Sequence, residues 1–450
     1  MTLEKEEKNL QPVGQIQAWK EFLTPKFHRL AEFLASQGIT TTGNLLYGFL
    51  CVRLLPISEY AQFAVVFGFL GALAILVDIG ASSTLLPLIG ERIGDCQLIA
   101  DYVASLRKLS RWLYVVVAPA LMVIFPIAVR RQGWNWHVVA FMVAILLVAV
   151  WCVRVGGAYG TVLIVRRDRT VWYRVQMISS LGKLALLGVL WSTHLLNAFS
   201  AMLISVGGIV FVSLALFIRA RYLLGVKGHS SEEKRKEIIH LALPLMPNAI
   251  YYALQGQISL FLITIFGRTA AVASVGALGR LAQVFVLFGQ MNPLFIEPYF
   301  AKLPRARLKR SYLGVLAVEG AISTFVICIA GCFPGLFLWV LGPKYSNLHF
   351  EVLLVIASSS ISYLHGVMWC IHSARRFVYW WNNIAIIVLT LAVEIFFIWR
   401  VDLSTVRAVL TLNLTMAAVS LPVSIVTGIY GFMRGPRGSA NMVPVQQEIG

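Results

Sequence analysis

Long apolar runs recur along the whole chain, and they restrict its fold more than any other feature. One of them, EYAQFAVVFGFLGALAILVDIG at residues 59–80, is almost wholly apolar from Tyr60 to Val77 and then presents Asp78. A helix that crosses the hydrocarbon core of a bilayer needs about 20 apolar residues. We expect twelve such helices, over residues 33–55, 59–89, 112–130, 136–158, 173–193, 197–219, 240–266, 270–299, 311–341, 349–371, 378–400 and 405–432.

The composition indicates a membrane protein. Of the 450 residues, 58% are hydrophobic and 13% are charged, whereas soluble domains are roughly a quarter charged. The formal net charge of +18 raises the question of nucleic acid, but the basic residues recur between apolar blocks and form no single patch. We therefore expect an all-α integral membrane protein with no nucleic-acid partner.

The basic residues also predict an orientation, because Lys and Arg concentrate in short cytoplasmic loops. The first 32 residues lack the apolar core of a cleaved signal peptide, so we expect the amino end in the cytoplasm. With that orientation, 29 of the 38 basic residues fall on the cytoplasmic side and seven on the outer side. The bias favours an even number of helices with both termini cytoplasmic; ten or fourteen are the alternatives to twelve.

The expected helices divide into two halves of six. A cytoplasmic amphipathic segment, residues 1–32, precedes an N-lobe at 33–219. A charged cytoplasmic linker at 220–239, which contains SSEEKRKE, is expected to be a solvated loop, and a C-lobe at 240–432 and a cytoplasmic tail at 433–450 follow it. Two bundles around a cavity near mid-membrane are typical of transporters.

A few ionisable residues fall inside the expected helices. Lys183, Arg280 and Glu319 lie near the middle, whereas Asp78 lies close to the cytoplasmic boundary. A buried charge costs at least ~2.5 kcal/mol on insertion scales, so we expect each of these residues to have either a compensating partner or a functional role. Either Lys183 or Arg280 pairs with Glu319 between packed helices, or the cations line a cavity and hold an anionic group such as phosphate.

The seventh expected helix is interrupted. It contains two prolines, Pro244 and Pro247, and the polar residues Asn248, Gln255 and Gln257. Proline removes a helical hydrogen bond and bends the helix. Interrupted spans with polar residues are typical of a transporter's moving or binding element, and hydrogen-bonded helix packing is the alternative.

Signatures of catalysis are absent from the sequence. There is no phosphate-binding GxxxxGK[ST] loop, no HExxH, no GxSxG and no paired-cysteine metal pattern. We expect no metal, no cofactor and no enzymatic activity. A membrane-embedded polysaccharide polymerase is the enzyme alternative, although the expected outer loops are short.

Two regions resemble a known family. They are GNLLYGFLCVRLLPISEYAQFAVVFGFLGALAILVDIGASSTLL at 43–86, and LALPLMPNAI followed by VGALGRLAQVFVLFGQMNPLFIEPYF. Both resemble Wzx-type polysaccharide flippases of the multidrug/oligosaccharidyl-lipid/polysaccharide (MOP) exporter superfamily, which also contains the MATE multidrug exporters and the lipid II flippases. The matched motifs carry Arg53, Asp78 and Arg280. The acid that many relatives have in helix seven is absent at Gln257-Ile258-Ser259.

The resemblance implies a two-lobed flippase of the bacterial inner membrane. It would translocate undecaprenyl-pyrophosphate-linked oligosaccharide by alternating access, for exopolysaccharide, capsule or O-antigen synthesis, among membrane lipids and other polysaccharide assembly proteins. A proton or sodium gradient is the candidate driving force. The expected substrate-binding residues are Arg280, Lys183, Arg53, Asn248, Gln255 and Gln257, and the expected coupling or gating residues are Asp78 and Glu319. A MATE-like exporter of cationic drugs is the main alternative.

Overall fold

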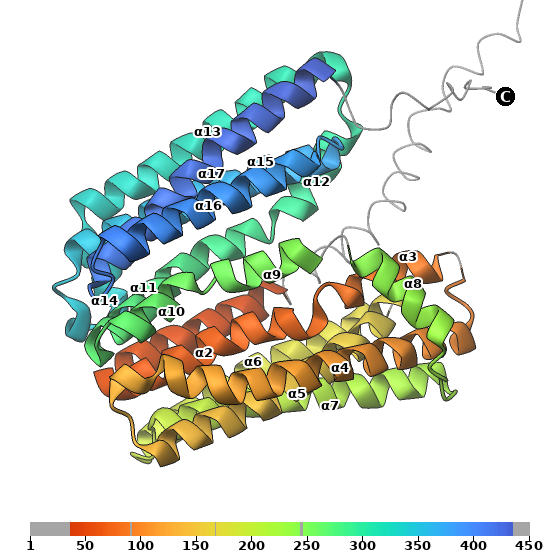
Figure 1. Ribbon diagram of the computed structural model, residues 1–450, viewed down its shortest axis with the longest axis horizontal. Coiled ribbons are helices and arrows are strands. Elements are labelled where there is room, and N and C mark those ends of the chain that lie inside the picture. The colour runs from red at the N-terminus through yellow and green to blue at the C-terminus, as the bar shows by residue number, and fades with distance from the viewer. Residues whose placement is uncertain (1–36, 91, 167, 244–245, 435–450) are drawn as a thin grey trace, which may run out of the picture.

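The computed structural model describes residues 37–90, 92–166, 168–243 and 246–434, and these form two helical bundles side by side (Figure 1). The expected N-terminal segment at 1–32 and most of the expected tail lie outside the described residues. The N-lobe contains helical residues 37–54, α2 (Ile57–Asp78), η1 (Ala81–Thr84), α3 (Leu85–Ile89), α4 (Cys96–Ala128), η2 (Arg130–Gln132), α5 (Trp136–Val165), α6 (Arg169–Ser192) and α7 (Ala198–Leu224).

The second bundle follows a short helix, α8 (Glu232–Ala242). This C-lobe contains α9 (Met246–Gln255), α10 (Ile258–Phe266), α11 (Thr269–Gly289), α12 (Asn292–Lys302), α13 (Arg305–Cys332), α14 (Pro334–Leu341), η3 (Pro343–Tyr345), α15 (His349–Ala374), α16 (Trp380–Arg400) and α17 (Val406–Arg434). We call the end that carries η2 and η3 the outer end, because the basic residues predict that it faces away from the cytoplasm.

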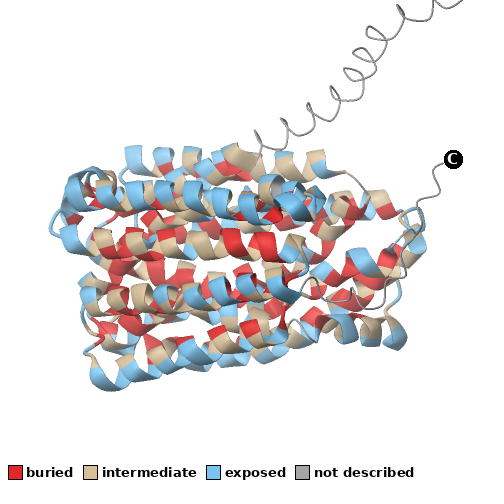
Figure 2. Cartoon of the chain, turned by 90° about the horizontal axis from the view of Figure 1, so that it is seen from above, coloured by how far each residue is buried: buried red, intermediate tan, exposed pale blue. Residues whose placement is uncertain are grey.

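The helices confirm an all-α membrane fold. Within the described residues, 10 helices are long and apolar enough to span a bilayer, and the bent pair α9 and α10 makes up to 11. Helical residues 37–54 occupy the place of the first expected span. Large apolar side chains such as Val116, Trp399 and Met433 are exposed on the outside of the bundles, where lipid would cover them, and buried residues fill the interior (Figure 2).

The boundaries of several spans differ from the expected ones. α4 begins at Cys96, although the apolar run suggested residue 112. Its first turns alternate charged residues with Ile99, Val103 and Leu106, which are buried, so this part is an amphipathic helix without a continuous apolar run. Asp95 begins the helix by accepting a hydrogen bond from the Leu98 backbone N–H at 2.9 Å.

The linker expected to be a solvated loop contains a docked helix instead. Ser231 accepts a hydrogen bond from the Lys234 backbone N–H and so begins α8. The helix packs on α4, where the Lys234 ammonium lies 2.6 Å from Asp101 and the Tyr102 hydroxyl donates to Glu237. The charges in this segment therefore serve both solvation and attachment to the N-lobe.

Three expected C-lobe helices are broken into shorter pieces, and prolines lie at all of these breaks except the one between α9 and α10, at Gly256-Gln257. Pro247 lies in the first turn of α9, Pro293 opens α12 and Pro334 begins α14. Proline fits the first turn of a helix, where its missing N–H has no helical partner, but it interrupts a continuing one. A bend of 51° separates α9 from α10.

The two lobes meet along α2 and α11, which lie between the outer helices in Figure 1. The contact depends on small residues. A Cβ atom placed on Gly276 of α11 would approach the Cβ of Ala64 to 2.6 Å. The helices therefore approach as closely as a glycine allows.

Candidate functional site

The described part of the C-lobe encloses a cavity of about 690 Å³. Helices α9, α11, α12, α15, α16 and α17 form its walls. Hydroxyl, amide and aromatic side chains predominate in the lining, among them Tyr251, Tyr252, Gln255, Phe285, Asn292, Ser358, Ser359, Ser362, Tyr363, Trp369, Asn413 and Ser420. A pocket of this size, with a few directed polar groups, is typical of a small-molecule site.

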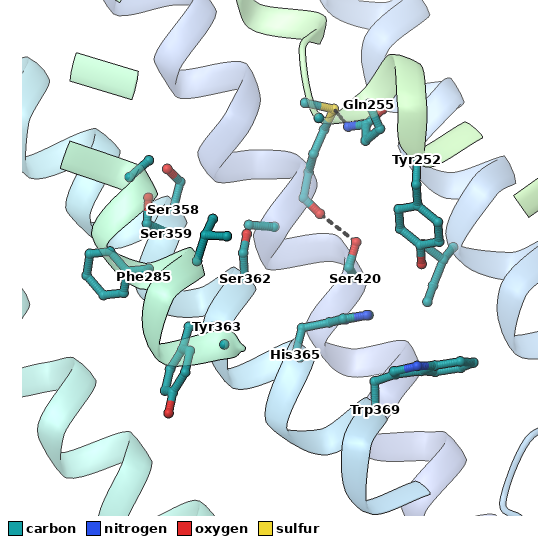
Figure 3. Close-up of a pocket in the computed structure, with 18 of the residues that line it drawn as sticks. Tyr252, Gln255, Phe285, Ser358, Ser359, Ser362, Tyr363, His365, Trp369 and Ser420 are labelled. Carbon is teal, nitrogen blue, oxygen red and sulfur yellow. Dashed lines mark hydrogen bonds between the residues drawn. The ribbon is translucent and has the colours of Figure 1, made fainter. Parts of the chain in front are cut away.

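Helix α15 supplies one face of the cavity. Ser362, His365 and Trp369 follow one another at spacings of three and four, so they share a helix face. Figure 3 shows this face opposite Tyr252 of α9 and Ser420 of α17. The face therefore offers donors, acceptors and an aromatic ring to a ligand between the helices.

The charge of the cavity is low. Among the described lining residues Glu297 of α12 is the only carboxylate, and no lysine or arginine contributes to the wall. His365 lies with its Nδ1 3.2 Å from the Ser424 hydroxyl. The cavity therefore carries little charge, and its polar groups are spaced over a wall that is largely apolar.

A buried carboxylate that the sequence reasoning missed lies behind this wall. Glu394 of α16 is only 8% exposed, and its Oε1 has no hydrogen-bond partner. Gln255 is its neighbour, and one turn away Thr390 forms a 2.5 Å hydrogen bond with the Tyr251 hydroxyl. The signal was present in the sequence, because Glu394 interrupts the expected span 378–400.

Arg280 of α11 is buried against the opposite lobe. Its Nε donates to the Tyr60 hydroxyl at 3.4 Å, and its Nη1 donates to Gln283 at 3.1 Å. The guanidinium carbon lies 4.3 Å from the centre of the Phe67 ring. Arg280 therefore joins α11 to α2 through an aromatic contact, and it does not line the described cavity.

Lys183 of α6 also contacts helical residues 37–54. Its ammonium donates to the Asn44 side chain and lies 5.8 Å from the centre of the Tyr47 ring. The charges of Lys183 and Arg280 both act on Cys51. A Cβ atom on Gly48 would come within 3.1 Å of Arg280, and Gly48 is one turn from Asn44, so the two predicted cations lie against the same face of this helix, outside the wall of the C-lobe cavity.

Arg53 lies exposed at the outer end. Its guanidinium is 5.5 Å from the centre of the Trp339 ring of the C-lobe. The Lys344 ammonium donates to the backbone carbonyls of Arg53 and Leu55 at 3.1 and 2.7 Å. Partial burial lowers the pKa of Lys344 below its usual value.

A second contact between the lobes at the outer end involves Gln132, which the sequence reasoning also missed. Its amide nitrogen donates to the carbonyls of Thr264 and Gly267 at 2.8 and 3.1 Å, and its oxygen accepts from the Thr269 hydroxyl at 3.0 Å. Gln132 and Lys344 therefore both satisfy exposed helix-end carbonyls of the opposite lobe. These contacts hold the outer end closed.

The polar residues of the interrupted seventh span lie in three different surroundings. Gln255 lines the cavity and donates to the Met416 sulfur at 2.9 Å. Gln257 instead reaches α2, where a Cβ atom on Gly71 would come within 3.3 Å of its amide nitrogen. Asn248 is half-buried near the start of α9 and does not contribute to the cavity wall.

The two predicted gating carboxylates also lie apart. Asp78 ends α2 and accepts hydrogen bonds from the backbone N–H and hydroxyl of Ser82, so it begins η1 after a left-handed turn at Ile79. Glu319 of α13 accepts a hydrogen bond from Tyr363, a cavity residue, at 3.2 Å. None of the ion pairs among the described residues joins Glu319 to Lys183 or Arg280.

We searched the described residues for clusters of side chains that could bind a metal ion. They contain no group of three or more His, Cys, Asp or Glu side chains that could hold a metal ion. The six cysteines are all free, and two of them are buried.

Comparison with known proteins identifies the fold. No family model and no curated protein sequence matches the chain. The structure is similar to an inward-facing multidrug resistance MATE family transporter of the MOP superfamily, with a TM-score of 0.65, 15% identity and coverage of 88% of this chain and 94% of the other.

Two further solved structures share the architecture. The lipid II flippase MurJ in an inward closed conformation has a TM-score of 0.63 at 11% identity, covering 90% of this chain and 88% of MurJ. A MATE structure in a bent conformation has a TM-score of 0.51 at 18% identity, covering 90% of this chain and 93% of the other. The chain therefore has the fold of MOP superfamily transporters, of the MATE and MurJ type.

Proposed function

We propose that this protein is a flippase that moves undecaprenyl-pyrophosphate-linked oligosaccharide outward across the bacterial inner membrane. The product would serve the assembly of exopolysaccharide, capsule or O-antigen. The shared fold includes a lipid II flippase, and the resemblance at 43–86 is to polysaccharide flippases. On this proposal both termini are cytoplasmic and the protein carries out no covalent chemistry.

The main support for this proposal is the lining of the C-lobe cavity. Sugars present many hydroxyl groups and apolar ring faces, so a site for them needs uncharged hydrogen-bond partners beside aromatic rings. Ser362, Ser420 and Gln255 supply the first kind of group, and Tyr252 and Trp369 supply the second. In this account the sugars contact this wall while the lipid tail remains in the bilayer.

The contacts between the lobes suit alternating access. At the outer end, Gln132 and Lys344 hold the lobes through hydrogen bonds to backbone carbonyls. Such bonds can be exchanged for bonds to water, at a net cost of about 1 kcal/mol for each bond of the neutral Gln132 amide and about 1.5–3 kcal/mol for each bond of the Lys344 ammonium. Rocking of the lobes about α2 and α11 would then open the outer end.

The predicted cations take different roles in this account. Lys183 is half-buried and free of carboxylate partners among the described ion pairs, so it is available to a pyrophosphate group. Arg280 positions the lobes through Tyr60 and Phe67. We propose coupling to a proton or sodium gradient, with Glu394 joining Asp78 and Glu319 as a candidate because its carboxylate is buried without a full set of partners.

A drug exporter remains the second candidate, and one observation favours it. Glu297 lines the cavity, and a carboxylate there would attract a cationic substrate. The buried cations Lys183 and Arg280 would repel a cationic substrate, but they lie outside the cavity wall. The two proposed functions therefore predict different effects of removing the Glu297 charge. Export of a cationic drug would require this charge, and translocation of the oligosaccharide would not.

Cells that lack the protein provide the test. We expect lipid-linked oligosaccharide to accumulate on the cytoplasmic leaflet, and expression of the wild type or of Glu297→Gln at equal membrane abundance to relieve the accumulation. Susceptibility to cationic dyes is measured in the same cells. Dye susceptibility that rises on deletion and is corrected by the wild type but not by Glu297→Gln, without oligosaccharide accumulation, would overturn the flippase in favour of the exporter.

A further inference from the structure

Three arginines gather where α4 meets α5 in the N-lobe. Arg154 of α5 is 5% exposed, and its Nη1 donates to the backbone carbonyl of Arg107 on α4 at 3.1 Å. Arg111 lies one turn further along α4, and the charges of Arg107 and Arg111 both act on Arg154. None of the ion pairs among the described residues includes any of the three.

The buried donors of this cluster are incompletely satisfied. The Nε atoms of Arg107 and Arg154 are both buried without a hydrogen-bond partner. Each of these two guanidinium groups packs on an aromatic ring. The guanidinium carbon of Arg154 lies 4.0 Å from the centre of the Trp151 ring, and that of Arg107 lies 5.2 Å from the centre of the Tyr159 ring. Like charges held together with unused donors indicate an anionic ligand, because leaving a charged donor unpaired in the interior is costly.

The depth of the cluster identifies where that ligand lies. Counting from the outer end of α5 at Trp136, Arg154 is about 27 Å along the helix at 1.5 Å per residue. From the outer end of α4 at Ala128, Arg111 is about 26 Å and Arg107 about 32 Å along the helix. The hydrocarbon core is about 30 Å thick, so all three lie at its cytoplasmic boundary, the level of lipid phosphate groups.

The cluster opens toward lipid on the outside of the bundle. Arg111 is exposed, and its neighbours Trp112 and Val115 are 63% and 53% exposed. On α5, Val148 and Trp151 are 51% and 40% exposed. These side chains form the lipid-facing surface on both sides of the arginines, and the cavity of the C-lobe has no wall in α4 or α5.

We propose that Arg107, Arg111 and Arg154 form a binding site for the phosphate group of an anionic phospholipid in the cytoplasmic leaflet. The guanidinium forks match phosphate oxygens. Trp151 would lie beside the glycerol backbone, as amphipathic rings do at membrane interfaces. The site stands apart from the proposed transport function and would exist in a flippase or an exporter alike.

The test is lipid retention by the purified full chain, measured by native mass spectrometry, together with its thermal midpoint in mixed micelles. The lipids are phosphatidylglycerol and phosphatidylcholine, and a further arm adds inorganic phosphate at matched ionic strength. We expect phosphatidylglycerol alone to be retained and to raise the midpoint. Arg111→Gln should weaken retention about tenfold, which corresponds to about 1.4 kcal/mol.

Two variants make the result decisive. Lys108→Gln removes the same charge at the same depth of α4 from an exposed position outside the cluster, and it should retain phosphatidylglycerol like the wild type. Arg154→Gln should lose retention, and because Arg111 is exposed, its variant remains informative if Arg154→Gln fails to fold. Equal loss in Arg111→Gln and Lys108→Gln, equal retention of phosphatidylcholine, or equal stabilisation by inorganic phosphate would each overturn the proposal.

Discussion

Arg280 illustrates how a buried cation can be held without a carboxylate. Its guanidinium contacts the rings of Phe63 and Phe67 and hydrogen-bonds with Tyr60 and Gln283. The sequence alone placed it near mid-membrane and offered two readings, an ion pair with Glu319 or a ligand for an anion. No ion pair with Glu319 is present among the described residues, and binding of an anion stays a prediction. The aromatic residues of the other lobe that surround the guanidinium could not be read from the sequence of α11.

Arg280→Ala should destabilise the contact between the lobes. It removes a desolvated cation–π contact, worth about 2 kcal/mol or more, and leaves the Tyr60 hydroxyl without its donor. We expect a lower thermal midpoint for the purified protein, measured by intrinsic fluorescence. Arg268→Ala, an exposed arginine next to the same helix, is the control. Equal midpoints for the two variants would show that Arg280 does not hold the lobes together.

Trp369 belongs to the cavity wall and should matter for transport more than for folding. Trp369→Leu removes the largest aromatic face that a sugar could contact, so we expect at least about a tenfold loss of translocation, as for a binding contact of about 1.4 kcal/mol. Trp399→Leu is the control, because Trp399 is 85% exposed on the lipid side of α16. Unchanged translocation by Trp369→Leu at normal membrane abundance would remove the cavity from the mechanism.

The lengths of the helices show what hydrophobic runs can and cannot predict. The apolar parts of the spans were predicted because burial in lipid requires them. The extension of α4 from residue 112 back to Cys96 was missed because its first turns are amphipathic, with Ile99 and Val103 buried between charged residues. Breaks at Pro293 and Pro334 were present in the sequence, but only packing decides whether a proline kinks a helix or starts a new one.

Because α2 and α11 approach closely, we expect alanine substitutions at two glycines of α11, Gly276 and Gly279, to have different effects on stability. Gly276→Ala should push α11 away from Ala64, at a cost of about 1–3 kcal/mol, because neither Cβ can move out of the way. Gly279 has no neighbour within 4 Å of an added Cβ and is exposed, so Gly279→Ala should be neutral or stabilising by up to about 1 kcal/mol. Thermal unfolding compares them. A lower midpoint for Gly279→Ala than for Gly276→Ala would contradict the contact.

For the molecule as a whole, the all-α membrane fold followed from the sequence, because apolar runs are local properties. The described residues contain 10 candidate spans, or up to 11 with the bent pair, against the twelve expected for the whole chain. The cavity did not follow from the sequence. Its wall combines residues from six helices, and a polar residue in an apolar run does not reveal which neighbour it faces. Gln255 and Gln257 illustrate this, since they are two positions apart yet one lines the cavity and the other reaches α2.

The closed outer end predicts the effect of a cross-link. In a chain whose six native cysteines are replaced, Gln132→Cys and Thr269→Cys would lie at the contact between the lobes. A short bis-methanethiosulfonate reagent, which joins the two thiols through disulfide bonds and releases methanesulfinate, should prevent the outer end from opening. We expect translocation to stop and to recover when the link is reduced. Continued translocation by the fully linked chain would mean that opening at this end is not required.

The most direct test of the proposed flippase activity uses purified protein in vesicles that contain a fluorescent undecaprenyl-pyrophosphate-linked oligosaccharide. A membrane-impermeant reductant reports how fast the labelled sugars move between leaflets. We predict movement much faster than in protein-free vesicles, with no comparable movement of a cationic dye. Movement of the labelled lipid no faster than in empty vesicles would contradict the account, and dye transport under the same conditions would identify the protein as an exporter.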